Sequence, residues 1–254
     1  MLVLKNVRKN FWDLKAVDNI SFEIKDGEIV SLIGSNGAGK TTLVNLISGY
    51  LKPDSGTIFF EDRDISQEAP YTRIHLGIGR SFQIINLFEN LSVLDNVRTP
   101  LFSKYGFIRR WLLPAGRYEK ITAEALAILE NFHLTDMKDS FPKELSEGDR
   151  KILDIAVAFA LKSKLLLLDE PTSGVATHDK FKVMDSIIAA IKKQGVSTMV
   201  IEHDMDIVSG YSDRVLVMHE GRLIADGRPE EVMENKEVKA FIFGITEEGH
   251  AAEN

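Results

Sequence analysis

Residues 34–42 carry the feature that most constrains this fold, the sequence Gly-Ser-Asn-Gly-Ala-Gly-Lys-Thr-Thr. Its glycine spacing lets backbone N–H groups close around a phosphate, and Lys40 is placed to neutralise the β- and γ-oxygens. The Thr41 hydroxyl is placed to hold Mg²⁺. An apolar stretch over 28–33 reads as a buried strand entering the loop, and 41–49 reads as a helix whose N-terminus faces the anion. The pattern predicts ATP and Mg²⁺ as ligands, with a glycine-rich turn beside a lysine as the alternative. The predicted nucleotide contacts in the loop are Ser35, Asn36, Gly37, Ala38, Gly39, Lys40, Thr41 and Thr42.

The composition limits the chemistry and the cellular location that the chain can have. It has 254 residues, a net charge of −7 and no cysteine, which excludes disulfides, thiol catalysis and cysteine zinc sites. The acidic balance argues against a nucleic-acid surface. The longest apolar stretches, 152–161 and 165–168, are interrupted or too short to span a bilayer, and residues 1–5 lack the build of a signal peptide. We expect a cytoplasmic protein that reaches a membrane only through a partner.

The order of the predicted elements indicates an α/β fold. Strands are expected at 2–7, 16–24 and 57–60, a helical texture from about residue 91 to 161, and then strands at 165–169, 197–201, 214–219 and 222–226 alternating with helices at 180–193 and 229–234. This order predicts a mostly parallel core sheet, a β-rich N-terminal part and an inserted helical subdomain. We expect one domain over 1–254, with the core and β subdomain at 1–90 and 163–244, the helical subdomain at 91–162 and a flexible tail at 245–254.

A second motif follows the buried strand at 165–168. Asp169 and Glu170 stand at its C-terminal edge, where ligands of open α/β sheets bind. We expect Asp169 to hold Mg²⁺ through water and Glu170 to polarise the water that attacks the γ-phosphate. An acidic pair after a strand is common by itself, and the phosphate loop is what favours the catalytic interpretation.

With these motifs in order over about 2–244, the chain resembles the nucleotide-binding subunits of ABC transporters, which have a P-loop NTPase core. The resemblance implies that Phe11 stacks on adenine with Val17 nearby. It also implies that Gln83 touches Mg²⁺ and the attacking water, and that His203 contacts the γ-phosphate. Without the family, these would be an ordinary strand-end aromatic, a solvent-facing glutamine and one histidine of six.

The motif Leu-Ser-Glu-Gly-Asp-Arg-Lys around Ser146 and Gly148 resembles the signature of that family, with acids at Glu147 and Asp149 where its commonest form has Gly and Gln. The resemblance implies that the Ser146 hydroxyl and the Gly148 N–H meet the γ-phosphate held by a second ATPase subunit, and that residues 173–176 cross to it. Since a carboxylate near that phosphate would be repelled, we expect both acids to point away from it. Helix capping is the ordinary alternative role for such acids, and reduced ATPase activity stays open.

A weaker resemblance indicates one subfamily. The phrases at 11–17, 79–83, 91–97 and 174–176 look like those of importers of branched-chain and other hydrophobic amino acids. This implies transmembrane permease subunits, a second ATPase subunit in a homo- or heterodimer, a solute-binding protein and a place on the inner face of the membrane. The apolar segment 101–116 packs either on a permease or on its own core.

The alternatives to an importer subunit are a lipid or lipopolysaccharide exporter ATPase and a soluble ABC ATPase without a transport role. A small-molecule P-loop kinase would lack the signature motif and the switch histidine.

The segment after Gln83 is more apolar than a free surface loop needs, which predicts a patch that a partner covers. Its apolar residues are Ile84, Ile85, Leu87, Phe88 and Leu91. By the resemblance, a groove here receives a short permease helix. Phe88 is the candidate anchor.

Overall fold

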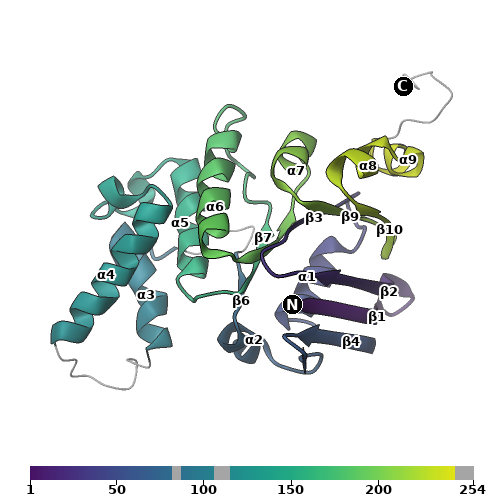
Figure 1. Ribbon diagram of the computed structural model, residues 1–254, viewed down its shortest axis with the longest axis horizontal. Coiled ribbons are helices and arrows are strands. Elements are labelled where there is room, and N and C mark those ends of the chain that lie inside the picture. The colour runs from purple at the N-terminus through teal and green to yellow at the C-terminus, as the bar shows by residue number, and fades with distance from the viewer. Residues whose placement is uncertain (82–86, 106–114, 244–254) are drawn as a thin grey trace. The chain divides into compact units, whose positions relative to one another are not determined.

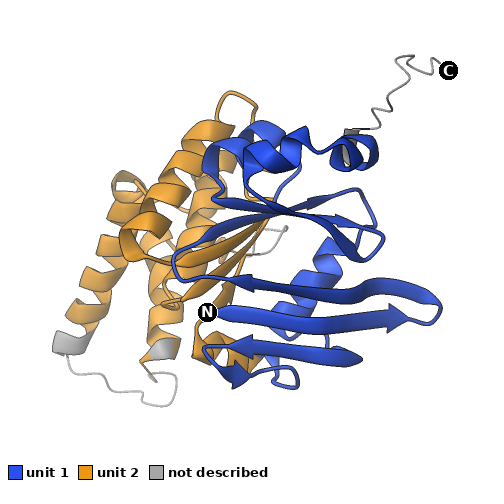
Figure 2. Cartoon of the chain, turned by 45° about the vertical axis from the view of Figure 1, so that its right-hand side comes forward, with its two compact units in different colours: residues 1–70, 201–254 blue, residues 71–200 orange. Residues whose placement is uncertain are grey.

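The computed structural model describes residues 1–81, 87–105 and 115–243. The chain divides into two compact units, unit 1 over Met1–Pro70 and Ile201–Asn254 and unit 2 over Tyr71–Val200 (Figure 2). Each unit contains part of the predicted site.

Unit 1 contains the phosphate loop, between β3 and α1. Its elements are β1 (Leu2–Phe11), β2 (Leu14–Ile24), β3 (Ile29–Gly34), α1 (Lys40–Ser48), β4 (Ser55–Phe60), β5 (Arg63–Asp64), α7 (Met205–Tyr211), β9 (Arg214–His219), β10 (Arg222–Gly227), α8 (Pro229–Glu234) and α9 (Lys236–Phe243). An antiparallel sheet has the order β2-β1-β4-β5. Beside it, β3 pairs in parallel with β9, and β9 pairs antiparallel with β10.

The strand β3 is buried along its whole length, as its run of apolar residues predicts. Its pairing with β9 continues to Gly34 opposite Met218, so the strand holds the first residue of the phosphate loop in the sheet. In Figure 1, α7 and α8 lie on one side of β3, β9 and β10, and α1 lies on the other. Ile33 packs in a buried cluster with side chains of α7, α8, α9 and β9. These apolar contacts fix the strand that delivers the loop.

Unit 2 contains the acidic pair and the signature motif. Its elements are α2 (Pro70–Leu76), β6 (Ile78–Arg80), α3 (Val93–Lys104), α4 (Ala115–Asn131), the short 3-10 turns η2 (Thr135–Met137) and η3 (Pro142–Glu144), α5 (Glu147–Phe159), β7 (Leu165–Asp169), α6 (Lys180–Gln194) and β8 (Ser197–Ile201). The strands β6 and β7 pair in parallel, and β8 lies on the other side of β7. The helices α3, α4, α5 and α6 pack together, with Phe132 and Phe159 meeting edge to face at 5.3 Å.

The α/β class with parallel core strands and an N-terminal antiparallel sheet is confirmed. The prediction missed α2, β5, β6, α7 and α9, each of which has at most eight residues and is too short to show a clear apolar period. It also ended the first strand at Val7, whereas β1 continues to Phe11 through pairing with β2.

The compact units divide at other positions than the predicted subdomains. The helical subdomain predicted over 91–162 falls inside unit 2, and its boundaries stay a prediction. Among the described residues, no helix is both long and apolar enough to cross a bilayer.

Candidate functional site

The phosphate loop is held by close backbone approaches that only glycine permits. A Cβ atom at Gly34 would lie 2.2 Å from the Met218 carbonyl oxygen, and one at Gly39 would lie 2.1 Å from that of Ala16. Gly39 is also the N-cap of α1, with φ 101°, a backbone conformation that glycine adopts most readily. The strands β9 and β2 therefore shape the loop from behind.

The Lys40 side chain is only 7% exposed. Its Nζ donates to the carbonyl oxygens of Gly34 at 2.6 Å and Ser35 at 3.0 Å. The loop thus carries a cation at the N-terminus of α1, where backbone N–H groups already favour an anion. This is the arrangement expected for binding a phosphate group.

The front of the loop is open. A Cβ atom at Gly37 would meet nothing within 4 Å, and Asn36 and Thr41 are exposed, whereas Ala38 is buried. No group of three or more His, Cys, Asp or Glu side chains with metal-site geometry occurs among the residues that the structure describes. Mg²⁺ in nucleotide sites is held by one or two protein oxygens with phosphates and water. Thr41 in unit 1 and Asp169 in unit 2 each offer one oxygen donor of that kind.

The hairpin between β1 and β2 presents Phe11, which is 42% exposed. The Lys9 ammonium lies 5.7 Å from the centre of the Phe11 ring and donates to Asp54 at 2.7 Å. Hydrogen bonds from Lys9 and the Asn10 amide lower the pKa of Asp54, so this carboxylate keeps the charge that anchors the strand. Val17, by contrast, is completely buried and packs in the core.

In unit 2, β7 places Asp169 and Glu170 at its end, as predicted. Asp169 is 7% exposed, and its Oδ2 accepts a hydrogen bond from Arg80 of the neighbouring strand β6 at 3.2 Å. Glu170 has φ 49°, a left-handed conformation that is unfavourable for a residue with a long side chain. Such strain is concentrated at functional sites, and here it turns the chain sharply just after the strand.

The signature motif forms the start of α5. Ser146 is the N-cap, and its Oγ accepts a hydrogen bond from the Asp149 amide at 3.1 Å. The same hydroxyl donates to Asp149 Oδ2 at 2.6 Å. Glu147 lies over the loop at 173–176, since a Cβ atom at Gly174 would be 3.7 Å from its carboxylate. Ser146 thus caps the helix, and Asp149 accepts from its hydroxyl, which agrees with the capping alternative for the acids. The expectation that both acids point away from a bound γ-phosphate stays a prediction.

His203 follows β8 and is exposed. Its backbone N–H donates to the buried Glu202 carboxylate at 3.1 Å, and Asp204 begins α7 as the N-cap. The histidine therefore stands where a strand changes into a helix. Gln83, Ile84 and Ile85 lie outside the described residues, and their predicted roles stay predictions.

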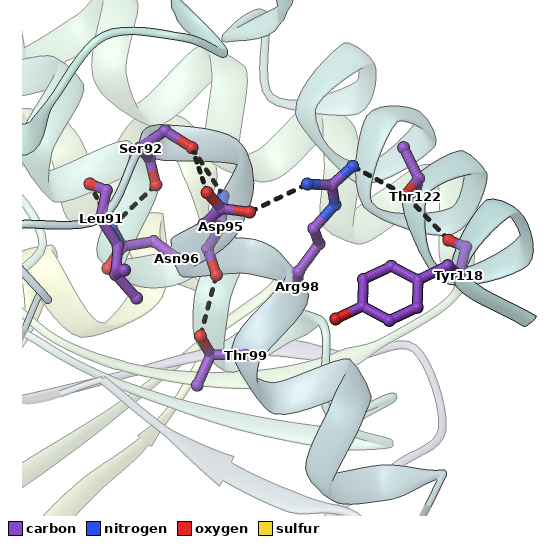
Figure 3. A network of polar contacts seen from close by, with 8 residues as sticks. All are labelled: Leu91, Ser92, Asp95, Asn96, Arg98, Thr99, Tyr118 and Thr122. Atoms are coloured by element: carbon purple, nitrogen blue, oxygen red, sulfur yellow. Dashed lines mark hydrogen bonds and ion pairs between the residues drawn. The ribbon is translucent and has the colours of Figure 1, made fainter. Parts of the chain in front are cut away.

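The loop that carries Phe88 is fixed by the buried side chain of Asn96. Asn96 accepts from the Phe88 amide at 2.8 Å and donates to the carbonyl oxygens of Phe88, Leu91 and Ser92 at 3.1, 3.2 and 3.0 Å. Figure 3 shows this start of α3, and the chain of contacts from Ser92 through Asp95 and Arg98 to α4. Phe88 itself is 56% exposed. The loop is ordered while its aromatic ring stays accessible.

The same loop is joined to the signature helix. Arg150 of α5 donates to Glu89 at 2.6 Å and to the Pro142 carbonyl oxygen at 3.1 Å.

The sequence did not predict the roles of Arg150, Asn96 and Arg80. For Arg80, the signal was an arginine at the end of a short apolar strand, whose partner becomes evident only when β6 and β7 are known to be neighbours.

Residues 17–173 match the family described as "ABC transporter". The chain is 35% identical over 246 residues to a probable branched-chain amino acid transport ATP-binding protein, LivG, of Methanocaldococcus jannaschii, covering 92% of each. It is 34% identical to the lipopolysaccharide export system ATP-binding protein LptB of Escherichia coli, covering 96% of this chain and 97% of that one.

Solved structures agree with these relatives. A crystal structure of the ADP conformation of an ATP-binding cassette of an ABC transporter has a TM-score of 0.85 and 32% identity, covering 96% of this chain and 99% of that one. A dimeric bacterial ABC transporter cassette has a TM-score of 0.75 and 26% identity, covering 90% and 99%. With its phosphate loop, acidic pair and signature motif in the places described, this chain belongs to the ABC transporter ATP-binding family and is one of its ATP-hydrolysing subunits.

Proposed function

We propose that this chain is the energy-coupling ATPase of an importer for branched-chain or other hydrophobic amino acids. The observation that carries the proposal is its similarity to a LivG protein over 92% of both chains. A lipopolysaccharide or lipid exporter ATPase is the second candidate, favoured by the similarity to LptB.

Nucleotide binding begins at the phosphate loop. ATP phosphates bind at the N-terminus of α1, where the Lys40 ammonium exchanges a loop carbonyl for phosphate oxygen. Phe11 provides the aromatic face for adenine, and Val17 supports that hairpin from the core. When bound, Mg²⁺ supplies neutralisation of the developing phosphate charge, and the oxygens of Thr41, Asp169 and Gln83 are the donors proposed to hold it.

Hydrolysis needs a base beside the γ-phosphate. Glu170 accepts a proton from the attacking water, and its left-handed backbone, with φ 49°, places it just beyond the end of β7. His203 donates a hydrogen bond to the γ-phosphate, and Gln83 orients the water. The Arg80 pair holds the neighbouring Asp169 carboxylate in one orientation.

Two ATPase subunits complete each site. Ser146 and the Gly148 N–H contact the γ-phosphate of ATP held by the second subunit, and the loop at 173–176 crosses to it. The dimeric cassette among the similar structures supports this arrangement. A homodimer or a heterodimer would meet the same chemical requirement.

The remaining partners are membrane permease subunits and a solute-binding protein. The ATPase would lie on the cytoplasmic face of the membrane, bound through the exposed Phe88 and Leu91, which are 56% and 38% exposed. Nucleic acid has no role in this proposal.

Affinity purification from solubilised membranes, followed by uptake assays with radiolabelled leucine in vesicles, tests the assignment. We expect a permease and a binding protein to co-purify, and ATP-dependent uptake of hydrophobic amino acids. Co-purification of lipid-export components without uptake would support the second candidate instead.

Lys40→Ala should weaken ATP binding about ten- to a hundred-fold, because it removes a charge-assisted hydrogen bond to phosphate. Isothermal calorimetry measures this affinity directly. Lys52→Ala, at an exposed lysine beyond the end of α1, is the matched control and should bind normally. Unchanged affinity in the Lys40 variant would contradict the phosphate-loop assignment.

Glu170→Gln should keep ATP binding but slow turnover by at least about a hundred-fold, because an amide hydrogen-bonds water yet accepts no proton. Gel filtration with Mg-ATP should show an accumulated dimer. Glu130→Gln, at an exposed position of α4, is the control for the chemical change. Near-normal hydrolysis at saturating Mg-ATP would remove Glu170 from its role.

Replacing Glu147 with Gly and Asp149 with Gln together should change ATPase activity only a few-fold, because exposed charges contribute about 0.2–1 kcal/mol each. The Asp149→Asn variant, which keeps the shape of the cap, separates the charge from the geometry. Steady-state kinetics at saturating ATP gives the ratio. A hundredfold gain would show that the acids strongly restrain the enzyme.

Phe88→Ala should weaken association with the permease by roughly 2 kcal/mol, since exposed aromatic anchors dominate interface energies. The isolated subunit should keep its melting temperature and basal ATPase, because the ring is already half in solvent. Phe241→Ala, at an exposed aromatic of α9, is the control. Normal assembly and transport by the Phe88 variant would place the coupling surface elsewhere.

A further inference from the structure

Trp12 stands at the tip of the hairpin between β1 and β2. Phe11 pairs with Leu14, so Trp12 and Asp13 form the two-residue turn. Trp12 has φ 52° and a side chain that is 100% exposed. The largest side chain of the hairpin therefore packs against no other described residue.

Both features are unfavourable for the isolated chain. A left-handed backbone is normally left to glycine or asparagine in such turns, because a Cβ atom crowds the following carbonyl group. A fully exposed indole also leaves a large apolar surface in water. Since folding gains nothing from this residue at this place, its use is to be sought in something that binds the hairpin.

The hairpin is continuous with the nucleotide site. Four residues after Trp12, the Ala16 carbonyl oxygen touches the loop at Gly39. The Gly221 amide donates to the Ala38 carbonyl oxygen at 3.0 Å, and the Asp18 amide donates to Gly221 at 2.8 Å, which holds β2 against the loop. Four residues of strand span at most about 14 Å. A nucleotide with its phosphates on the loop extends its ribose and base over a comparable range.

The neighbouring aromatic ring leaves room for a second contact. One side of the Phe11 ring is covered by the Lys9 ammonium, 5.7 Å from its centre. The nucleobase thus has access to a single face of Phe11. An indole one residue further along the chain offers a separate aromatic surface to the same flat ligand.

We propose that Trp12 is a second aromatic contact for the nucleobase, which closes on the base beside Phe11 when nucleotide binds. The proposal rests on the proposed function, in which the phosphate loop binds ATP. Aromatic stacking tolerates any base with a flat π-face. Trp12 therefore raises the affinity for purine nucleotides without forming hydrogen bonds to the edges of the base. The strain at φ 52° is retained because the contact with the base offsets it.

Fluorescence offers a direct test, because the chain has only two tryptophans, Trp12 and Trp111. In the Trp111→Phe protein, the emission of Trp12 should change on titration with ATP and with ADP. Inorganic tripolyphosphate, which binds the loop but has no base, should leave the emission unchanged. No change with saturating ATP, when calorimetry shows that ATP is bound, would overturn the proposal.

Affinity measurements with Trp12→Gly provide the second arm. Glycine is the residue best suited to the positive φ, so the variant should fold and melt no lower than the parent. It should bind ATP about five-fold more weakly, in line with the loss of one stacked base contact, and bind tripolyphosphate equally well. Leu14→Gly removes apolar surface from the same hairpin, where Leu14 is 66% exposed, and should bind ATP normally.

The outcomes separate this proposal from the proposed function. Equal ATP affinity of Trp12→Gly and parent overturns the role of Trp12 and leaves ATP binding at the loop intact. Absence of ATP binding by the parent protein would reject the proposed function itself. A Trp12 signal that depends on protein concentration, or on added permease, but not on nucleotide would make the indole a protein contact and overturn the proposal.

Discussion

The close approach of two strand carbonyl groups to the phosphate loop is the constraint on which the rest of the site depends. Met218 and Ala16 place their carbonyl oxygens where any Cβ atom at Gly34 or Gly39 would collide. Because these oxygens belong to β9 and β2, the loop is set by two sheets at once. Lys40 then lies inside a cradle whose width is fixed by backbone rather than by flexible side chains. A catalytic loop built in this way tolerates variation at its exposed face but very little at its back.

Unit 2 organises its part of the chemistry through side chains. Asp169 is oriented by Arg80, the Phe88 loop by Asn96, and the signature helix is joined to that loop by Arg150 and Glu89. These contacts join β6 to β7, and join the Phe88 loop to α3 and α5, within one compact unit. A signal passing between nucleotide and permease would therefore travel through hydrogen bonds as well as through packed apolar surfaces.

Sequence reasoning located the elements whose physical signal is local. The buried runs that end at Gly34 and Asp169 are apolar enough to be read as strands, and the loop spacing identifies Lys40 directly. Long-range pairs were not predictable in the same way: Arg80 and Asp169 are 89 positions apart and meet only because β6 and β7 are neighbours. The hydrogen bonds between Ser146 and Asp149 were not predictable for a different reason. Repulsion from a phosphate predicts only that the acid points away from it, whereas the partner of the carboxylate is set by the local hydrogen bonds at the start of the helix.

The Ser146–Asp149 contact has a consequence for the energetics of the proposed ATP sandwich. The serine hydroxyl already donates to an anion of its own chain, so it gains no hydrogen bond when a phosphate arrives. In the proposed sandwich, closure at this position would be an anion exchange, in which the γ-phosphate displaces a carboxylate and the number of hydrogen bonds stays the same. The free energy gained by closure at the serine is then the difference between two charge-assisted bonds rather than the whole of one. Such a subunit would open again with little resistance after the phosphate leaves, because Asp149 accepts the serine hydrogen bond in its place.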